Sequence, residues 1–140
     1  MKAHLSRRYL FCASHRLHSD AMTDEQNQIT YGKCNNPYGH GHNYIVEITV
    51  SGPIHEQTGM VCNLTDLDGF MQREVLARYD HENLNLLPAF SHQVPTTENL
   101  CIQIYEIVQR GFPLAHLERV RLEETMMNSF EYAGEKEPTR

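Results

Sequence analysis

Alternating apolar and polar residues mark three segments of the chain as β-strands. They run from Arg7 to His15, from Asn43 to Gly52 and from Leu117 to Thr125. Successive side chains of a strand point to opposite faces, so each segment has one face suited to a hydrophobic core. A return strand from Met60 to Leu64 is expected to pair with the second segment, because Gly-Pro and Thr-Gly dipeptides bracket a turn between them.

Two further segments have the periodicity of amphipathic helices. The first is expected to begin with Thr65 as its N-cap and to end near residues 77–79. The second is expected to begin at residues 96–99 after Pro95 and to end at Gly111. Residues 18–31 are polar and predict a long loop with a short helical turn at 24–28. The element order predicts an α+β fold, in which two helices cover one face of a four-stranded antiparallel sheet.

Composition narrows the class of protein. A length of 140 residues predicts a single domain over residues 1–140. The net charge of −6 argues against nucleic acid as a partner. Neither an N-terminal apolar region nor a long apolar run is present in the sequence, so no signal peptide and no membrane partner are expected. Four cysteines without CxxC spacing favour reduced thiols and a cytoplasmic location.

Nine histidines are many for this length, and three of them suggest a metal site. His40 and His42 lie two residues apart in the segment that runs into the second strand, so in an extended chain their imidazoles point to the same side. His15 ends the first strand on the face that carries Phe11. If the two strands pair, three imidazoles meet, and three histidines with an open fourth position are typical of catalytic zinc. A lone histidine at a strand end would more often be structural.

Cys34 lies six residues before His40, among residues typical of a loop. A cysteine of the core would normally lie within an apolar run, as Cys62 and Cys101 do. Lys33 or a nearby metal would lower the pKa of the Cys34 thiol and favour a nucleophilic or basic thiolate. Without the histidines, an inert loop cysteine is an equally good interpretation.

Other polar residues carry weaker signals. Asp80 and His81 form an acid–imidazole pair that can relay protons, although such pairs also occur in ordinary polar loops. Glu124 extends the apolar face of the last strand, where a carboxylate needs a partner; it either anchors a ligand with paired N–H donors or is solvated past the strand end. Thr96 and Thr97 are expected to cap a helix and could also contact a ligand.

Taken together, these segments resemble the 6-pyruvoyl-tetrahydropterin synthase family. The resemblance covers nearly the whole chain in the order of the family, and the Cys-x5-His-Gly-His block is its most specific part. The matching stretches are Phe11–Leu17, Tyr31–Tyr44, Thr58–Leu67, Asp80–Leu84, Pro95–Asn99 and Glu123–Thr125.

The resemblance implies a fold, an assembly and a cofactor. The fold is the tunnelling fold, in which three subunits close their sheets into a barrel and two trimers stack as a homohexamer. Zinc is implied at His15, His40 and His42.

The resemblance also implies a reaction and roles for particular residues. Cys34 would abstract a proton, Asp80 and His81 would relay protons, from the same subunit or a neighbouring one, and Glu124 would anchor the pterin. The implied reaction is a lyase step of tetrahydrobiopterin biosynthesis, which converts 7,8-dihydroneopterin triphosphate to 6-pyruvoyl-tetrahydropterin and triphosphate.

The triphosphate requires local positive charge despite the net charge of −6. Arg8, Arg16 and Lys33 are the candidates, with Mg²⁺ as a possible companion of the triphosphate. No glycine-rich nucleotide loop is visible in the sequence, in keeping with a reaction that needs no redox cofactor.

The chain departs from the family pattern at two places. Cys12 stands where the family usually has serine, on the face opposite His15, where it should not matter. Met126 and Met127 replace a more usual polar pair, which bears on ligand contacts just beyond Glu124.

Two alternatives stay open. The first is 6-carboxy-tetrahydropterin synthase of queuosine biosynthesis, which shares fold, zinc and substrate but often has a shorter spacing between the cysteine and His-Gly-His. The five residues between Cys34 and His40 favour the pyruvoyl reaction. The second alternative is a non-catalytic, zinc-stabilised pterin-binding module.

Overall fold

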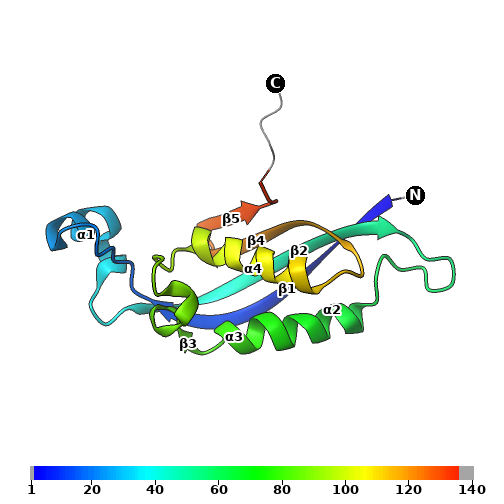
Figure 1. Cartoon of the computed structure of the whole chain (residues 1–140), viewed down its shortest axis with the longest axis horizontal. Helices are drawn as coiled ribbons and strands as arrows, with labels where there is room; N and C mark the ends of the chain where they lie inside the picture. Colours follow the sequence, from blue (N-terminus) through cyan, green and yellow to red (C-terminus); the bar gives the residue numbers. More distant parts are fainter. Residues whose placement is uncertain (1, 136–140) are drawn as a thin grey trace, which may run out of the picture.

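One mixed β-sheet forms the body of the protein in the computed structural model, which describes residues 2–135 (Figure 1). The strand order is β3-β1-β2-β4-β5. Neighbouring strands are antiparallel except β3, which pairs with β1 in parallel over two residues. The strands are β1 (Lys2–His15), β2 (His40–Pro53), β3 (Glu82–Asn83), β4 (His116–Thr125) and β5 (Asn128–Tyr132).

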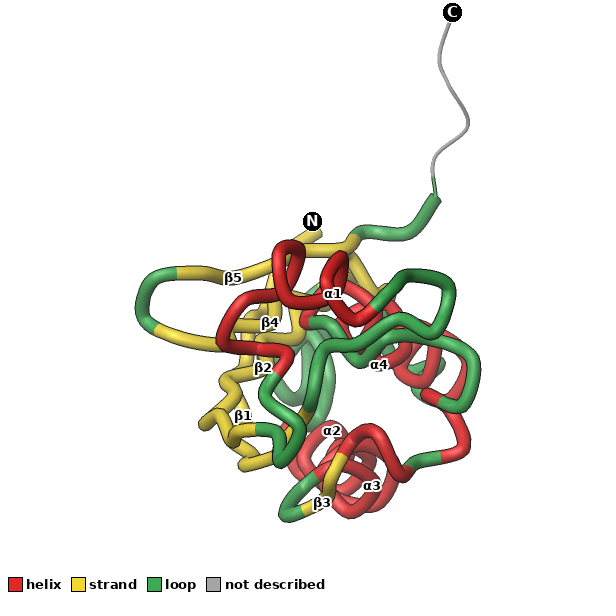
Figure 2. The backbone as a smooth tube through the Cα atoms, turned by 90° about the vertical axis from the view of Figure 1, so that its left-hand side faces the viewer, coloured by secondary structure: helices red, strands yellow, loops and turns green. Residues whose placement is uncertain are grey.

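Helices cover one face of this sheet. Figure 2 looks along the molecule and shows the strands on one side and α2, α3 and α4 on the other. The helices are α1 (Asp24–Tyr31), α2 (Leu64–Met71), α3 (Ala77–Tyr79) and α4 (Thr97–Gly111). A π-helical turn, Gln72–Leu76, joins α2 to α3, so the three pieces form one continuous helical segment. The expected α+β architecture with two long helical segments on one face is confirmed.

The details differ from the sequence prediction in three places. Met60–Leu64 is not a return strand: residues 60–63 are irregular and Leu64 begins α2, capped by the side chain of Asn63 rather than by Thr65. The polar segment expected to be mostly loop contains a complete helix, α1, because Thr23 and Gln26 form a reciprocal capping box. The sheet has five strands rather than four, since β5 and the two-residue β3 were not predicted.

The core lies between the sheet and the helices. Phe11 of β1, Tyr44 of β2 and Leu122 of β4 are buried on the covered face, as the alternation predicted. They pack with residues of the apolar faces of α2 and α4, such as Leu67 and Leu100. Burial of these side chains supplies the main driving force for holding the layers together.

On the opposite face of the sheet no helix lies within the described residues 2–135 (Figure 2), and β1 and β2 present polar side chains there. The hydroxyls of Ser6 and Thr49 hydrogen-bond there across β1 and β2 at 2.8 Å. The Arg8 guanidinium lies 3.5 Å from the carboxylate of Glu47. Both pairs are partly shielded, since Thr49 is buried and the Glu47 side chain is only 17% exposed, so they link β1 and β2 on this face.

The end of β1 and the start of β2 meet at one end of the sheet, where the candidate site lies. His15 pairs with His40, and Ala13 pairs with His42. Gly39 precedes this point with a positive φ of 70°, and a Cβ atom there would lie 2.9 Å from the carbonyl oxygen of His15. Only glycine tolerates both conditions, so Gly39 lets the loop approach β1 closely.

The C-terminal part of the described chain lies against α4. Gly134 packs against Tyr105 of α4; residues 136–140 lie outside the described residues. Within residues 2–135, none of the helices has the length and apolar character needed to cross a membrane.

Candidate functional site

Three imidazoles meet where β1 ends and β2 begins. The ring centroids of His15 lie 5.0 Å from those of His40 and of His42, and the centroids of His40 and His42 are 4.7 Å apart. One ligand nitrogen from each ring lies within 4.8 Å of the others. The antiparallel pairing of β1 with β2 produces this arrangement, because it places all three side chains on one face. The sequence prediction that these histidines converge is confirmed.

The hydrogen bonds of His15 determine which of its nitrogens can bind a metal. Its Nδ1 lies 2.8 Å from the carbonyl oxygen of Pro95, which can only accept, so Nδ1 carries the proton. Its Nε2 therefore presents a lone pair. Among the described residues, Nε2 of His15 and Nε2 of His42 are the buried side-chain polar atoms without a hydrogen-bond partner.

Burial keeps these imidazoles in the form that binds metals. It lowers the pKa values of His15 and of His42, although the carboxylate of Glu124 opposes the shift in both. A neutral imidazole with a free nitrogen is a ligand for zinc. Unpaired buried nitrogens are unfavourable unless something binds them, so the three histidines fit a metal ion with one or more coordination positions left open.

Glu124 lies beside the histidine cluster rather than in solvent. Its side chain is 13% exposed, and its Oε1 lies 3.8 Å from Nε2 of His42. The hydroxyl of Thr97, the first residue of α4, donates a hydrogen bond to Oε2 of Glu124. Thr96 caps the same helix by accepting from the backbone N–H of Asn99 at 3.1 Å. Glu124 therefore lies within β4 and is largely shielded from solvent, whereas its expected role as the anchor of a ligand stays a prediction.

Cys34 lies on a short 3-10 turn, Gly32–Asn35, between α1 and β2. It lines a pocket of about 750 Å³ together with Lys33 and His40. Burial, and secondarily the charge of Glu124, raises the pKa of the Cys34 thiol. A thiolate at this position consequently needs a compensating cation.

Asp80 and His81 lie on a different part of the surface. Oδ1 of Asp80 accepts from the backbone N–H of Cys12 at 2.9 Å and lies 3.1 Å from Nδ1 of His81. His81 has a positive φ of 62°, and its side chain is 82% exposed. It lines a pocket of about 480 Å³ with Cys12 and with His42 of the histidine cluster, whereas Cys34 lines the pocket of about 750 Å³ with His40. Within one chain, the expected relay pair and Cys34 thus do not share a pocket.

Among the candidate cations, Lys33 lines the pocket of Cys34, and the Nε of Arg16 donates to the carbonyl oxygen of Asn35 at 3.2 Å. Arg8 lies farther along β1 and pairs with Glu47. Met126 and Met127 are 96% and 91% exposed at the turn between β4 and β5.

Two residues near the site had no signal in the sequence. The carbonyl oxygen of Pro95 orients His15 by accepting from its Nδ1, and the phenol oxygen of Tyr44 lies 3.3 Å from the same Nδ1. A backbone carbonyl carries no residue-specific signal. Tyr44 was visible only as an apolar residue of an alternating strand.

Known proteins resemble this chain along nearly its whole length. A sequence model of the 6-pyruvoyl tetrahydropterin synthase family matches residues 4–135. The chain is 46% identical over 135 residues to 6-pyruvoyl tetrahydrobiopterin synthase of Homo sapiens. The matched region covers 96% of this chain and 93% of the human protein. A solved structure of 6-pyruvoyl tetrahydropterin synthase from Caenorhabditis elegans matches with a TM-score of 0.92 and 37% identity, covering 96% of this chain and 97% of that one.

Similarity to the carboxy enzymes is shorter. A putative 6-carboxy-5,6,7,8-tetrahydropterin synthase of Archaeoglobus fulgidus is 38% identical over 86 residues, which are 61% of this chain and 67% of that protein. The longer matches and the convergent histidines lead to one conclusion: this chain belongs to the 6-pyruvoyl tetrahydropterin synthase family.

Proposed function

We propose that this protein is a zinc-dependent lyase that converts 7,8-dihydroneopterin triphosphate to 6-pyruvoyl-tetrahydropterin with loss of triphosphate, a step of tetrahydrobiopterin biosynthesis. The observation that carries the proposal is that a loop thiol, Cys34, lines the same pocket as His40 of the three-histidine cluster. A base beside a metal site suits proton abstraction from a carbon that bears a hydroxyl group. Membership of the family, and relatives that bear the name of this activity, support the same reaction.

In this proposal, His15, His40 and His42 hold the zinc ion. Bound there, zinc would act as a Lewis acid on the side-chain hydroxyls of the substrate and acidify the adjoining carbons. Pro95 keeps His15 in the tautomer that leaves Nε2 free for this role.

Cys34 is the proposed base that takes a proton from carbon. Because burial and Glu124 raise the pKa of its thiol, positive charge nearby is required to hold it as a thiolate. Lys33 lines the same pocket and is one source of that charge. Lys33 and Arg16 are also the proposed contacts of the triphosphate, with Mg²⁺ as its companion, while Arg8 is farther away and already paired.

Glu124 is the proposed anchor of the pterin ring. A carboxylate can accept two N–H groups from the guanidine-like edge of such a ring, and its low exposure strengthens those hydrogen bonds. Thr97 supports Glu124 through its hydroxyl and is proposed as a further contact of the substrate. Thr96 is committed to capping α4, which makes its role in binding secondary.

Assembly is part of the proposal, because His81 of the relay pair and Cys34 line different pockets of one chain. Asp80 and His81 would serve the Cys34 of a neighbouring subunit. Two edges of the sheet are available for pairing: β5 is an edge strand, and β1 pairs with β3 only at Ala13 and Ser14. Joining such edges would close three sheets into a barrel, and two barrels would give the homohexamer.

The four cysteines are free in the structure. Free thiols support the proposal of a cytoplasmic protein.

The test is the identity of the product formed by zinc-loaded protein from 7,8-dihydroneopterin triphosphate. We expect 6-pyruvoyl-tetrahydropterin and triphosphate, identified by chromatography and mass spectrometry. Cys34→Ala should lower the rate by about 100-fold or more, because a general base typically contributes 10²–10⁴-fold. Cys62→Ser is the matched control, since Cys62 lies beyond the Pro53 end of β2, the end opposite His40, and it should keep the normal rate.

Three outcomes would contradict this proposal. A 6-carboxy product with release of acetaldehyde would assign the protein to the carboxy reaction. Binding of zinc and pterin without turnover would make it a non-catalytic module. Normal turnover by Cys34→Ala would remove the thiol from the mechanism while leaving the reaction in place.

A further inference from the structure

Cys34 lies on a turn rather than on the sheet, so something other than strand pairing must hold it relative to the histidines. Two backbone contacts contribute. The N–H of Leu17 donates to the carbonyl oxygen of Cys34 at 2.7 Å, and the Nε of Arg16 donates to the carbonyl oxygen of Asn35 at 3.2 Å. Both donors belong to the segment that directly follows His15 at the end of β1.

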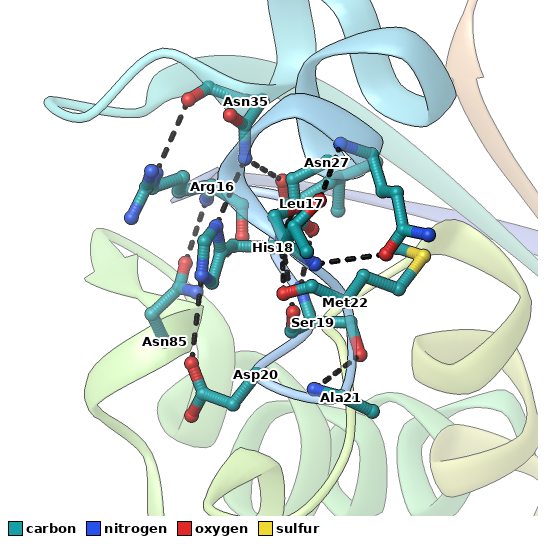
Figure 3. Close-up of polar contacts among 12 residues, drawn as sticks. Arg16, Leu17, His18, Ser19, Asp20, Ala21, Met22, Asn27, Asn35 and Asn85 are labelled. Atoms are coloured by element: carbon teal, nitrogen blue, oxygen red, sulfur yellow. Dashed lines mark hydrogen bonds and ion pairs between the residues drawn. The ribbon is translucent and has the colours of Figure 1, made fainter.

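The side chain of Asn35 joins the same two segments, but here the turn supplies the donor and the segment after His15 supplies the acceptors. Asn35 is 7% exposed, and its Nδ2 donates to the carbonyl oxygen of Leu17 at 2.8 Å. The same Nδ2 lies 3.2 Å from Nδ1 of His18 (Figure 3). An amide nitrogen has two N–H donors and cannot accept, so both donors are used and Nδ1 of His18 must be the acceptor.

The other partners in this network hold His18 and Arg16 in place. With Nδ1 accepting, the proton of neutral His18 lies on Nε2, which faces Oδ1 of Asp20 at 3.5 Å. Asn85 brackets Arg16 by accepting from its backbone N–H at 2.7 Å and donating to its carbonyl oxygen at 2.8 Å (Figure 3). The segment that receives the Asn35 amide is therefore itself fixed.

We propose that Asn35 is a positioning residue, which holds the Cys34 turn in register with the chain leaving His15 and so sets the place of the thiol relative to the three-histidine cluster. The inference rests on the proposed role of Cys34 as the base. Asn35 lines the same pocket as Cys34, but both N–H donors of its amide are used within the network, so its proposed role is to position the turn and not to act on the substrate. Misplacement of a reacting group by about 1 Å can lower a rate by about 100-fold, so the fixed turn matters for catalysis.

Asn35→Ala tests this inference, and Asn27→Ala is its matched control. Asn27 is also a buried asparagine of this region, fully shielded from solvent, but its amide binds the backbone of Ser19, Met22 and Thr23 instead (Figure 3). Both variants lose a buried amide with several hydrogen bonds, so both should lose stability to a similar degree. Only Asn35→Ala removes a contact of the turn that carries Cys34, and it loosens that turn while the hydrogen bonds from Leu17 and Arg16 remain.

Two measurements are made on the zinc-loaded proteins: steady-state turnover, and the rate at which iodoacetamide alkylates Cys34, resolved from the other cysteines by mass spectrometry of peptides. For Asn35→Ala we expect kcat to fall by about 100-fold with KM nearly unchanged. Alkylation of Cys34 should become at least about threefold faster, because the loosened turn exposes a thiol that is partly buried in the intact protein. Asn27→Ala should change neither quantity by more than about twofold, and both variants should keep their zinc.

A thiol that reacts faster while turnover falls in Asn35→Ala, but not in Asn27→Ala, is the signature of lost positioning, because a general loss of stability would act in both variants. The inference is wrong if kcat of Asn35→Ala stays within about twofold, if kcat falls without faster alkylation, or if Asn27→Ala has the same effects. Failure of the proposed function looks different. If Cys34→Ala kept normal turnover, the role of the thiol would be refuted whatever Asn35 does to its alkylation.

Discussion

At the scale of single residues, the metal site depends on which nitrogen of each ring is free. The carbonyl oxygen of Pro95 settles this for His15, and burial keeps His15 and His42 neutral. Neutral rings whose Nε2 atoms are buried and lack a hydrogen-bond partner are preorganised to bind a metal ion. The residue types were readable from the sequence, whereas the tautomer of His15 was not, because it depends on a residue 80 positions away.

His42→Ala should remove the metal. Loss of one of three ligands leaves an incomplete site, and we expect zinc affinity to fall by at least about 100-fold. This is a larger loss than most substitutions of residues that only contact the ligands would cause. Elemental analysis after dialysis, followed by competition with a chromophoric chelator, measures this. His55→Ala, in the exposed loop after β2, is the matched histidine control. Full retention of zinc by His42→Ala would exclude the three-histidine site.

At the scale of elements, the packing of α2 on β1 depends on one polar contact as well as on the core. Arg7 binds both oxygens of Asp68 at 2.8 Å, and the phenol of Tyr9 donates to the same carboxylate at 2.6 Å. Arg7 and Tyr9 share a face of β1, two residues apart, so one carboxylate on α2 can bind both. These hydrogen bonds lower the pKa of Asp68.

This contact predicts a pH dependence of stability. Asp68 has a lower pKa in the folded protein than in the unfolded chain, so its stabilising effect is present above the unfolded value of about 4 and is lost as the pH falls through the lowered value. Asp68→Asn should lower the thermal midpoint at pH 7, and its midpoint should fall less than that of the wild type between pH 5 and pH 2. The effect is modest, because the Arg7 and Asp68 side chains are 41% and 40% exposed.

Asp66→Asn is the control for this prediction, because Asp66 lies on the same helix two residues before Asp68, while Arg7 and Tyr9 bind Asp68. Its pH profile should follow that of the wild type. Melting curves recorded by circular dichroism across the pH range provide the comparison. Equal profiles for Asp68→Asn and the wild type would show that the contact does not contribute.

The boundaries of the helices and strands show which elements the hydrophobic pattern of the sequence predicted and which it did not. Long alternating or periodic segments such as β1, β2, β4 and α4 were predicted, because one face of each is buried in a continuous core. The sequence of Met60–Leu64 also has the pattern of a strand, but Asn63 caps α2, so Leu64 is the first residue of the helix. Helix α1 has little apolar surface, and β5 follows an abrupt turn at residues 126–127, so neither had a strong hydrophobic pattern.

At the scale of the whole molecule, the site of one chain is incomplete if Asp80 and His81 serve Cys34. The two groups line separate pockets, and the sheet has edges that a second copy could join. The proposed assembly brings them together between subunits. This feature can be tested without a structure of the oligomer.

Mixed oligomers of Cys34→Ala and His81→Ala should regain activity that neither variant has alone. If each site takes its thiol from one subunit and its relay from another, random mixing leaves about a quarter of the sites with both intact groups. Co-expression with two different tags, followed by a turnover assay, measures the recovery. Cys34→Ala mixed with the Cys34→Ala,His81→Ala double variant is the control and should stay inactive. Absence of recovery, in particles shown by sedimentation to be hexamers, would place the relay within one subunit.

The sequence by itself determined the residue types, the strand faces on which they lie and the family. Alternation placed His15, His40 and His42 on compatible faces, because the direction of side chains along a strand is a local property of the backbone. Only the tertiary structure decided the pairing register, the tautomer of His15, the contact between Glu124 and Thr97, and the Asn35 network behind Cys34. Each of these joins segments far apart in the chain, and such contacts follow from how the layers pack together, which local patterns do not specify.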